Sequence, residues 1–167
     1  MFRLLESPTK RPIDDNNMNH QHSTIPVIKL PGVVAALVQK GKRMTILYIE
    51  NHGRFADIVT AQFLASHEVE RIPTIAGARE LLNRREYEIL IVDYDLDDGK
   101  GAEIVSEVAS RKKRPRMIAA SSRDEGNEHM MSCGADATCS KMDFDEIEEV
   151  ISQVVARSNA GDAEPQD

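Results

Sequence analysis

The sequence lacks tryptophan and has few other aromatic residues and few cysteines. Its 167 residues include three tyrosines, four phenylalanines and two cysteines. Because aromatic residues make up only 4% of the chain, the core must consist mainly of Ile, Leu, Val, Ala and Met. The spacing of Cys133 and Cys139 fits neither a zinc-ligand pair nor a redox pair. We therefore interpret both as small buried residues in a reducing compartment, and we expect a cytoplasmic protein.

Long apolar runs and clustered positive charges are also missing. No apolar run approaches about 18 residues, so no membrane-spanning segment is predicted. The N-terminal residues MFRLLESPTK contain no apolar signal-peptide core. The formal net charge is −7, and residues 111–114 form the only dense basic patch in the middle of the chain. Phosphate contacts need clustered Lys and Arg, so we expect neither a nucleic acid nor a membrane as a direct partner.

The length suggests one domain with flanking tails. Residues 1–43 are predicted to be a largely disordered N-terminal extension, because residues 7–24 are polar and interrupted by proline. Residues 33–40 can form a short helix, which is marginal alone and needs a surface to dock on. Residues 44–156 are expected to form the domain, and residues 157–167 a disordered C-terminal tail.

Short apolar runs alternate with helical stripes through the expected domain. The expected strands are 44–49, 68–72, 87–92, 117–121 and 137–140, and the expected helices are 55–65, 75–82, 102–109, 124–133 and one that a capping box of Asp143 and Glu146 begins. This alternation predicts an α/β fold, a five-stranded parallel sheet with helices on both faces. In such sheets, chemistry gathers where the carboxyl ends of the strands meet.

Polar side chains follow four of the five predicted strands. Glu50 and Asn51 follow the first strand, Asp93 ends the third, Ser121 the fourth, and Lys141 follows the fifth. Clustered carboxylates repel one another and need a cation, and Mg²⁺ prefers oxygen ligands of this kind. An amine and a hydroxyl opposite that ion suit the oxygens of a phosphoryl group. The set therefore predicts a site for phosphoryl transfer onto a carboxylate.

This pattern resembles the receiver domain of the response regulators of bacterial two-component systems, over residues 44–156. The motif positions of that family are met by Glu50–Asn51, Asp93, Gly101, Ser121, Gly134–Ala135 and Lys141. The resemblance implies the flavodoxin-like (βα)5 fold, with Asp93 as phosphoacceptor and with Lys141 and Ser121 binding the phosphoryl oxygens. It further implies Mg²⁺ held by Glu50, Asn51, Asp93 and the backbone carbonyl of Asp95.

The resemblance also implies a role in signalling. A sensor histidine kinase or a histidine phosphotransfer protein would supply the phosphoryl group. A stand-alone receiver, as monomer or weak homodimer, would then signal through contacts with a downstream protein. Such a protein is not an enzyme, beyond its own phosphorylation from phosphodonors and its own dephosphorylation.

Four departures from the family pattern leave other interpretations open. Asn51 replaces a carboxylate, so Mg²⁺ should bind more weakly. Met142 replaces the proline after the lysine, which favours a trans peptide bond there, and Thr138 replaces the aromatic switch residue. The loop after Ser121 is short, so that the position of the family's hydroxyl residue can also fall on Ala120 or Ser122. These departures favour an alternative, a phosphorylation-independent binding module.

Two further interpretations concern the neighbourhood of Asp93. The sequence Asp93–Tyr94–Asp95 also resembles the D-x-D motif of phosphatases of the haloacid-dehalogenase type, although that motif normally ends the first strand. We interpret residues 97–100 as a flexible, solvated acidic loop. We interpret His52 as an exposed loop histidine beside the acidic pair; the alternative is that its side chain touches the site.

Overall fold

The computed structural model describes residues 42–161. The predictions for the N-terminal extension therefore lie outside the described residues, except at residues 42 and 43, and so do those for residues 162–167. The last helix continues to Gly161, five residues beyond the expected domain end at residue 156. Within the described part of the chain, no helix is both long enough and apolar enough to cross a membrane.

A five-stranded parallel sheet forms the centre of the domain. Its strands are β1 (Thr45–Ile49), β2 (Glu68–Ile72), β3 (Ile89–Asp93), β6 (Arg116–Ala120) and β7 (Ala137–Thr138). They lie in the order β2-β1-β3-β6-β7, and all pairs are parallel. The predicted five-stranded α/β fold is confirmed. Because β3 is the middle strand, the residue at its carboxyl end lies at the centre of the sheet edge.

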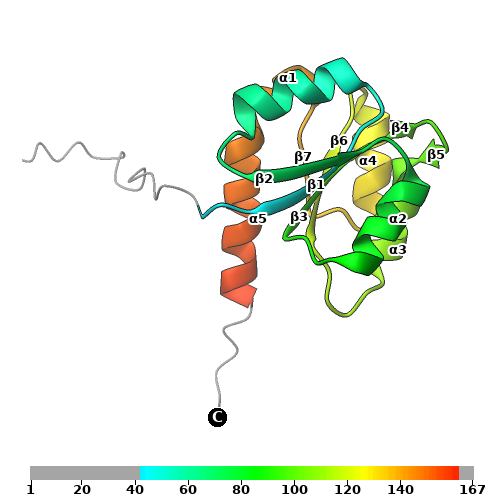
Figure 1. Ribbon diagram of the computed structural model, residues 1–167. Coiled ribbons are helices and arrows are strands. Elements are labelled where there is room, and N and C mark those ends of the chain that lie inside the picture. Colours follow the sequence, from blue (N-terminus) through cyan, green and yellow to red (C-terminus); the bar gives the residue numbers. More distant parts are fainter. Residues whose placement is uncertain (1–41, 162–167) are drawn as a thin grey trace, which may run out of the picture. The chain divides into compact units, whose positions relative to one another are not determined.

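Helices cover both faces of this sheet (Figure 1). They are α1 (Gly53–Phe63), α2 (Ile75–Arg84), α3 (Gly101–Ala109), α4 (Asp124–Ser132) and α5 (Ile147–Gly161). One apolar cluster joins the sheet to α1 and α5, and a second joins it to α2, α3 and α4. Every residue of β3 is buried, as expected for a strand with apolar side chains on both faces.

Local sequence signals explain several helix ends. The hydroxyl of Thr74 accepts a hydrogen bond from the backbone N–H of Gly77 at 3.2 Å and so caps α2. Gly134 follows α4 with a φ of 108°, the left-handed conformation that favours glycine after a helix. Both cysteines are free thiols, but only Cys139 is buried; Cys133 is partly exposed, contrary to expectation.

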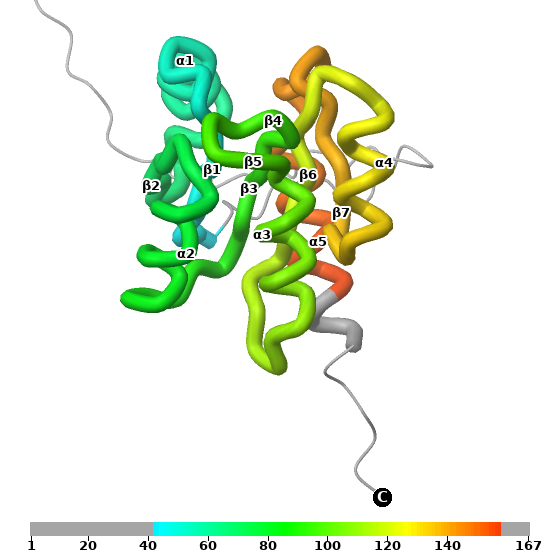
Figure 2. Tube along the Cα trace, turned by 90° about the vertical axis from the view of Figure 1, so that its right-hand side faces the viewer, coloured from blue at the N-terminus to red at the C-terminus, as the bar shows by residue number. Residues whose placement is uncertain are grey.

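The segment after β3 is a hairpin and not the expected flexible loop. Asp95–Leu96 (β4) pairs antiparallel with Gly99–Lys100 (β5), and the hairpin leads directly into α3 (Figure 2). The carboxylate of Asp98 accepts hydrogen bonds from the backbone N–H groups of Ile75 and Ala76, at 2.8 and 2.9 Å. Asp98 therefore fastens the hairpin to the start of α2, where a negative charge is favourable.

A short 3-10 helix, η1 (Lys141–Glu146), precedes α5 in place of the expected capping box at Asp143. The hydroxyl of Ser140 caps it by accepting a hydrogen bond from the backbone N–H of Met142 at 3.1 Å. The described residues contain no cis peptide bond, so the bond between Lys141 and Met142 is trans, as predicted. The 3-10 turn thus places Lys141 directly after the edge strand β7.

Candidate functional site

Glu50 lies at the carboxyl end of β1 and is fully buried. Its carboxylate accepts hydrogen bonds from the Tyr48 hydroxyl at 3.3 Å and from the backbone N–H of His52 at 2.8 Å. Its Oε2 atom lies 2.6 Å from the ammonium of Lys141. Burial and, next, the negative charge of Glu50 raise the pKa of Tyr48, so this hydroxyl remains a donor at neutral pH. The buried charge of Glu50 is therefore matched by several donors.

Asp93 lies at the carboxyl end of β3, beside Glu50. Its Oδ1 atom accepts hydrogen bonds from the backbone N–H of Tyr94 at 2.7 Å and from the ammonium of Lys141 at 2.9 Å. Burial raises the pKa of Asp93 and the charge of Glu50 adds to this, whereas Lys141 and the N–H of Tyr94 oppose it; the net direction is upward. Two buried carboxylates thus share one ammonium group.

Aromatic residues hold the ammonium of Lys141 in place. It lies 5.3 Å from the centre of the Phe55 ring, a distance suited to a cation–π contact. Phe55 in turn packs edge-on against Phe144, with ring centres 5.7 Å apart. Only 13% of the Lys141 side chain is exposed. The amine therefore reaches the two carboxylates through an apolar surround, where ion pairs are weakly screened.

Gly101 is required for the close approach of α3 to the end of β3. A Cβ atom at this position would lie 2.0 Å from the carbonyl oxygen of Asp93 and 2.8 Å from a methyl group of Val92. The backbone N–H of Gly101 also donates to the carbonyl of Tyr94 at 2.8 Å. The glycine that the sequence places eight residues after Asp93 thus permits the chain to pass directly beside the candidate phosphoacceptor.

Ser121 follows β6 and is buried, whereas Ser122 is exposed. The hydroxyl of Ser121 accepts a hydrogen bond from the backbone N–H of Arg123 at 3.1 Å, and the backbone N–H of Ser121 donates to the side chain of Asn127 at 3.0 Å. Because Ala120 pairs with Asp93 in the sheet, Ser121 comes one residue beyond the level of Asp93. Of the two candidate hydroxyls, Ser121 is the one fixed at the strand end.

The remaining predicted metal ligands lie around the same edge. The amide group of Asn51 donates to the carboxylate of Asp97 at 2.8 Å, and its buried Oδ1 atom has no hydrogen-bond partner. The carboxylate of Asp95 pairs with both Lys100 and Arg123. The predicted role of the Asp95 carbonyl as a metal ligand stays a prediction.

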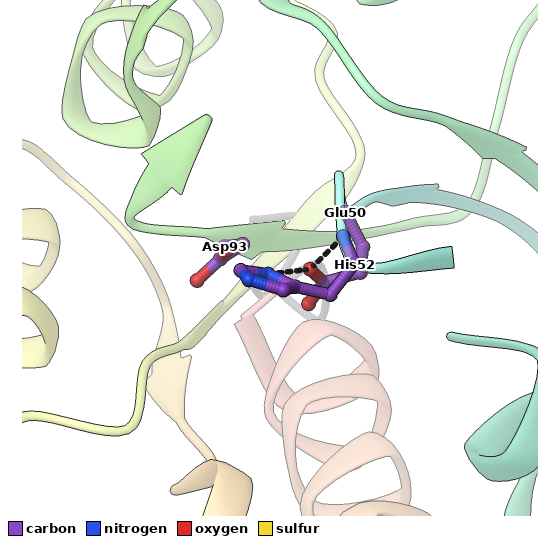
Figure 3. Close-up of side chains that lie close together, drawn as sticks. All are labelled: Glu50, His52 and Asp93. Atoms are coloured by element: carbon purple, nitrogen blue, oxygen red, sulfur yellow. Dashed lines mark hydrogen bonds and ion pairs between the residues drawn. The ribbon is translucent and has the colours of Figure 1, made fainter. Parts of the chain in front are cut away.

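His52 lies close to both carboxylates of the site, and its side chain is 70% exposed, as the sequence predicted for a loop histidine. Ligand atoms of Glu50, His52 and Asp93 all lie within 4.8 Å of one another. Figure 3 shows the imidazole ring of His52 extending past the Glu50 carboxylate towards Asp93. The His52 Nδ1 atom is 3.2 Å from Glu50 Oε1. The sequence signal was the position of His52, two residues after Glu50 and three residues after the end of β1.

The donor set of this pocket fits a divalent cation. Two carboxylates meet at one point, and a third potential oxygen ligand, Asn51 Oδ1, is buried without a partner. A buried polar atom of this kind costs free energy unless water or an ion satisfies it. The residues present therefore fit Mg²⁺, the cation that the resemblance to receiver domains implied.

No family model and no curated protein matches the chain. Solved structures that resemble it include the receiver domain of the Francisella response regulator 1452, at 16% identity and a TM-score of 0.62, covering 70% of this chain and 99% of that one. The response regulator TrrA from Thermotoga maritima, in complex with Mg²⁺-BeF, gives 20% identity and a TM-score of 0.60, covering 68% and 99%.

A third similar structure is a response regulator from Burkholderia pseudomallei with a phosphorylated aspartic acid, a calcium ion and citrate. It gives 17% identity and a TM-score of 0.56, covering 71% of this chain and 72% of that one. At such low identity, the structural similarity establishes the fold alone. The described domain has the CheY-like receiver fold that the sequence predicted.

Proposed function

We propose that this chain is a phosphoryl-accepting receiver. Asp93 accepts a phosphoryl group from a sensor histidine kinase or a histidine phosphotransfer protein, and the chain signals through contacts with a downstream protein. The observation that carries this proposal is the position of Lys141. Its ammonium lies 2.6 Å from Glu50 and 2.9 Å from Asp93 at the carboxyl edge of the sheet, where an anion bound to Asp93 would meet it.

The transfer is a substitution at phosphorus. A carboxylate oxygen of Asp93 forms a bond to phosphorus while the bond from phosphorus to the imidazole nitrogen of the donor breaks, and the imidazole leaves with that electron pair. Lys141 and Ser121 bind the phosphoryl oxygens. Mg²⁺, held by Glu50, Asp93, Asn51 and the Asp95 carbonyl, would neutralise the charge that develops on the phosphoryl group.

The groups around Asp93 suit a carboxylate nucleophile, because they do not stabilise its negative charge strongly. Burial and the neighbouring Glu50 raise the pKa of Asp93, and Lys141 opposes that rise. A carboxylate with a raised pKa is a better nucleophile than one held by strong donors alone. Added positive charge from a metal ion would favour the ionised form further. In this proposal, metal binding and ionisation of Asp93 therefore favour each other.

The proposal is tested by intact-mass measurement after incubation with acetyl phosphate and Mg²⁺. The wild-type chain is expected to gain the mass of one phosphoryl group, and Asp93→Asn, which cannot form the acyl phosphate, to gain none. Chelation of the metal should also prevent the gain. A wild-type chain that stays unmodified, under conditions that label an ordinary receiver, would contradict the proposal.

That contradicting result would favour the second candidate, a binding module that is never phosphorylated. Two observations support it: Asn51 replaces a carboxylate, and Thr138 on β7 is exposed and carries no aromatic ring that could report the phosphorylated state. Thr138 instead lines a shallow groove of about 480 Å³ between α4 and β7. An inert module of this kind would show no stabilisation by Mg²⁺.

The phosphatase interpretation has less support. In a D-x-D phosphatase the second aspartate serves in catalysis, but the carboxylate of Asp95 is paired with Lys100 and Arg123. Asp93 also ends the third strand of the described domain and not the first. We therefore do not expect turnover of phosphate esters.

A further inference from the structure

We infer that His52 is a metal ligand and that it gives this pocket a preference for transition-metal dications over Mg²⁺. This inference rests on the metal site of the proposed function and specifies which ions occupy it. It concerns ions that accept an imidazole nitrogen, of which Co²⁺ is a convenient probe. Mg²⁺ prefers oxygen ligands and gains little from such a nitrogen.

The geometry of the three donors supports a shared ion. Two atoms that both bind one ion at about 2.1 Å can lie at most about 4.2 Å apart. The ligand atoms of Glu50, His52 and Asp93 already lie within 4.8 Å of one another, so small side-chain rotations bring all three into range. The three residues come from the ends of neighbouring strands β1 and β3, so the sheet itself sets their spacing.

The two oxygens of Glu50 have separate partners. Oε2 faces the ammonium of Lys141 at 2.6 Å, whereas Oε1 faces the Nδ1 atom of His52 at 3.2 Å. A cation bound between Oε1 and the imidazole therefore does not have to displace Lys141 from Oε2. The phosphoryl-binding amine and the metal can be present together, as the proposed transfer requires.

The backbone holds His52 at this position independently of its side chain. Its N–H donates to Glu50 Oε1 at 2.8 Å, and its carbonyl accepts from the N–H of Ala56 at 3.0 Å in the first turn of α1. The side chain makes no capping hydrogen bond to α1 and is 70% exposed. An incoming ion can therefore reach the ring from solvent, and the side chain can be replaced without removing a helix cap.

The neighbouring Asn51 strengthens the argument for selectivity. The neutral amide leaves the pocket with two carboxylates, Glu50 and Asp93, and two of their four oxygens, Glu50 Oε2 and Asp93 Oδ1, are already paired with Lys141. Mg²⁺ depends on ligand charge and should bind weakly here. Transition-metal ions gain a bond to nitrogen, and their affinities rise along the series from Mn²⁺ to Cu²⁺ for such mixed sites.

The test compares Co²⁺ and Mg²⁺ affinities of the full chain by calorimetric titration, with the visible absorption of bound Co²⁺ as a second readout. Three variants are compared with wild type: His52→Ala, His52→Gln, which keeps a polar side chain near Glu50, and His129→Ala as a matched control. His129 contacts Tyr94 and lies outside the three-residue cluster. All proteins carry alanine in place of His20 and His22, the two histidines of the N-terminal extension, so that this pair does not bind the probe.

Wild type and His129→Ala are expected to prefer Co²⁺ over Mg²⁺. Both His52 variants should lose about tenfold or more in Co²⁺ affinity, with Mg²⁺ affinity nearly unchanged and the Co²⁺ absorption altered. An unchanged ratio of affinities in both His52 variants would overturn the inference. Phosphorylation of the same proteins with acetyl phosphate and Mg²⁺ tests the proposed receiver function separately. If Asp93 is phosphorylated but the ratio of Co²⁺ to Mg²⁺ affinity is unchanged in the His52 variants, the inference about His52 is wrong and the receiver function stands.

Discussion

Replacement of Lys141 by alanine is expected to lower the free energy of unfolding by about 3–5 kcal/mol at neutral pH. The substitution leaves the buried carboxylates of Glu50 and Asp93 beside each other without their shared ammonium. The hydrogen bonds that remain, from Tyr48, His52 and Tyr94, carry no positive charge to offset the repulsion between the carboxylates. Removing one partner of a buried ion pair in this way is costly. Chemical denaturation of variant and wild type measures the difference.

The pH and metal dependence of this loss identify its origin. The pKa of Asp93 is raised in the folded state, so the folded protein binds that proton more tightly than the unfolded chain. Stability from this group is complete below the unfolded pKa and is lost as pH rises through the folded pKa. Loss of the Lys141 ammonium in Lys141→Ala should raise the pKa of Asp93 in the folded state further. The difference in free energy of unfolding between variant and wild type should therefore shrink at acidic pH. Mg²⁺ should also stabilise the variant more than it stabilises wild type.

A matched lysine provides the control. Lys113 pairs with Glu86, but both side chains are almost fully exposed, and such pairs contribute little to stability. Lys113→Ala should therefore behave like wild type. Equal effects of the two substitutions, or a Lys141→Ala deficit that neither acid nor Mg²⁺ reduces, would show that the carboxylate pair does not depend on Lys141.

Replacement of Gly101 by alanine is also expected to lower the free energy of unfolding strongly, in this case for steric reasons. The new methyl group would lie 2.0 Å from the carbonyl oxygen of Asp93, a backbone atom that can move only with the end of β3. Overpacking of this kind costs about 1–3 kcal/mol and occasionally more, and we expect a loss at or above the upper end of that range. Displacement of Asp93 should also slow its phosphorylation markedly, as measured by intact mass.

Gly53→Ala is the control for this substitution. The nearest atom to a Cβ at Gly53 is the end of the Arg71 side chain at 3.0 Å, which can rotate away. Alanine also favours a helix more than glycine does, so stability should not fall. If Gly101→Ala were as stable and as readily phosphorylated as Gly53→Ala, the close approach of α3 to Asp93 would have no functional importance.

The central features of the fold and site could be predicted because they depend on periodicity and strand order. The five apolar runs alternate with helical stripes, which fixes a parallel sheet. The residues that follow those runs then have to meet at one edge. That is why Glu50, Asp93 and Lys141, separated by more than forty residues at each step, were expected together and are in contact.

Features that depend on single side-chain contacts between distant segments could not be predicted. The acidic residues after Asp93 were expected to be solvated, but Asp98 binds the start of α2 and Asp97 accepts a hydrogen bond from Asn51. The sequence near Lys141 carries a plausible capping box, yet Ser140 caps a 3-10 turn there instead. Tertiary contacts decide the first case, and competition between two local caps decides the second.

The interpretation of His52 illustrates the same limit. The position of His52 after β1 was the one sequence signal, and that position suits a solvated loop histidine equally well. Its proximity to Asp93 arises because β1 and β3 are adjacent strands with Ile49 paired to Val92. That register places His52, three positions beyond the end of β1, beside the carboxylate that ends β3.

Thermal unfolding in the presence of the phosphoryl mimic beryllofluoride, measured with and without Mg²⁺, tests whether the cation and the phosphoryl group bind in the same pocket. We predict that the wild-type protein is stabilised strongly only when both are present, because each bound ligand strengthens the site of the other. Asp93→Asn should show no joint effect. Independent, additive effects of the two ligands, or the same response in Asp93→Asn, would contradict a common site at Glu50, Asp93 and Lys141.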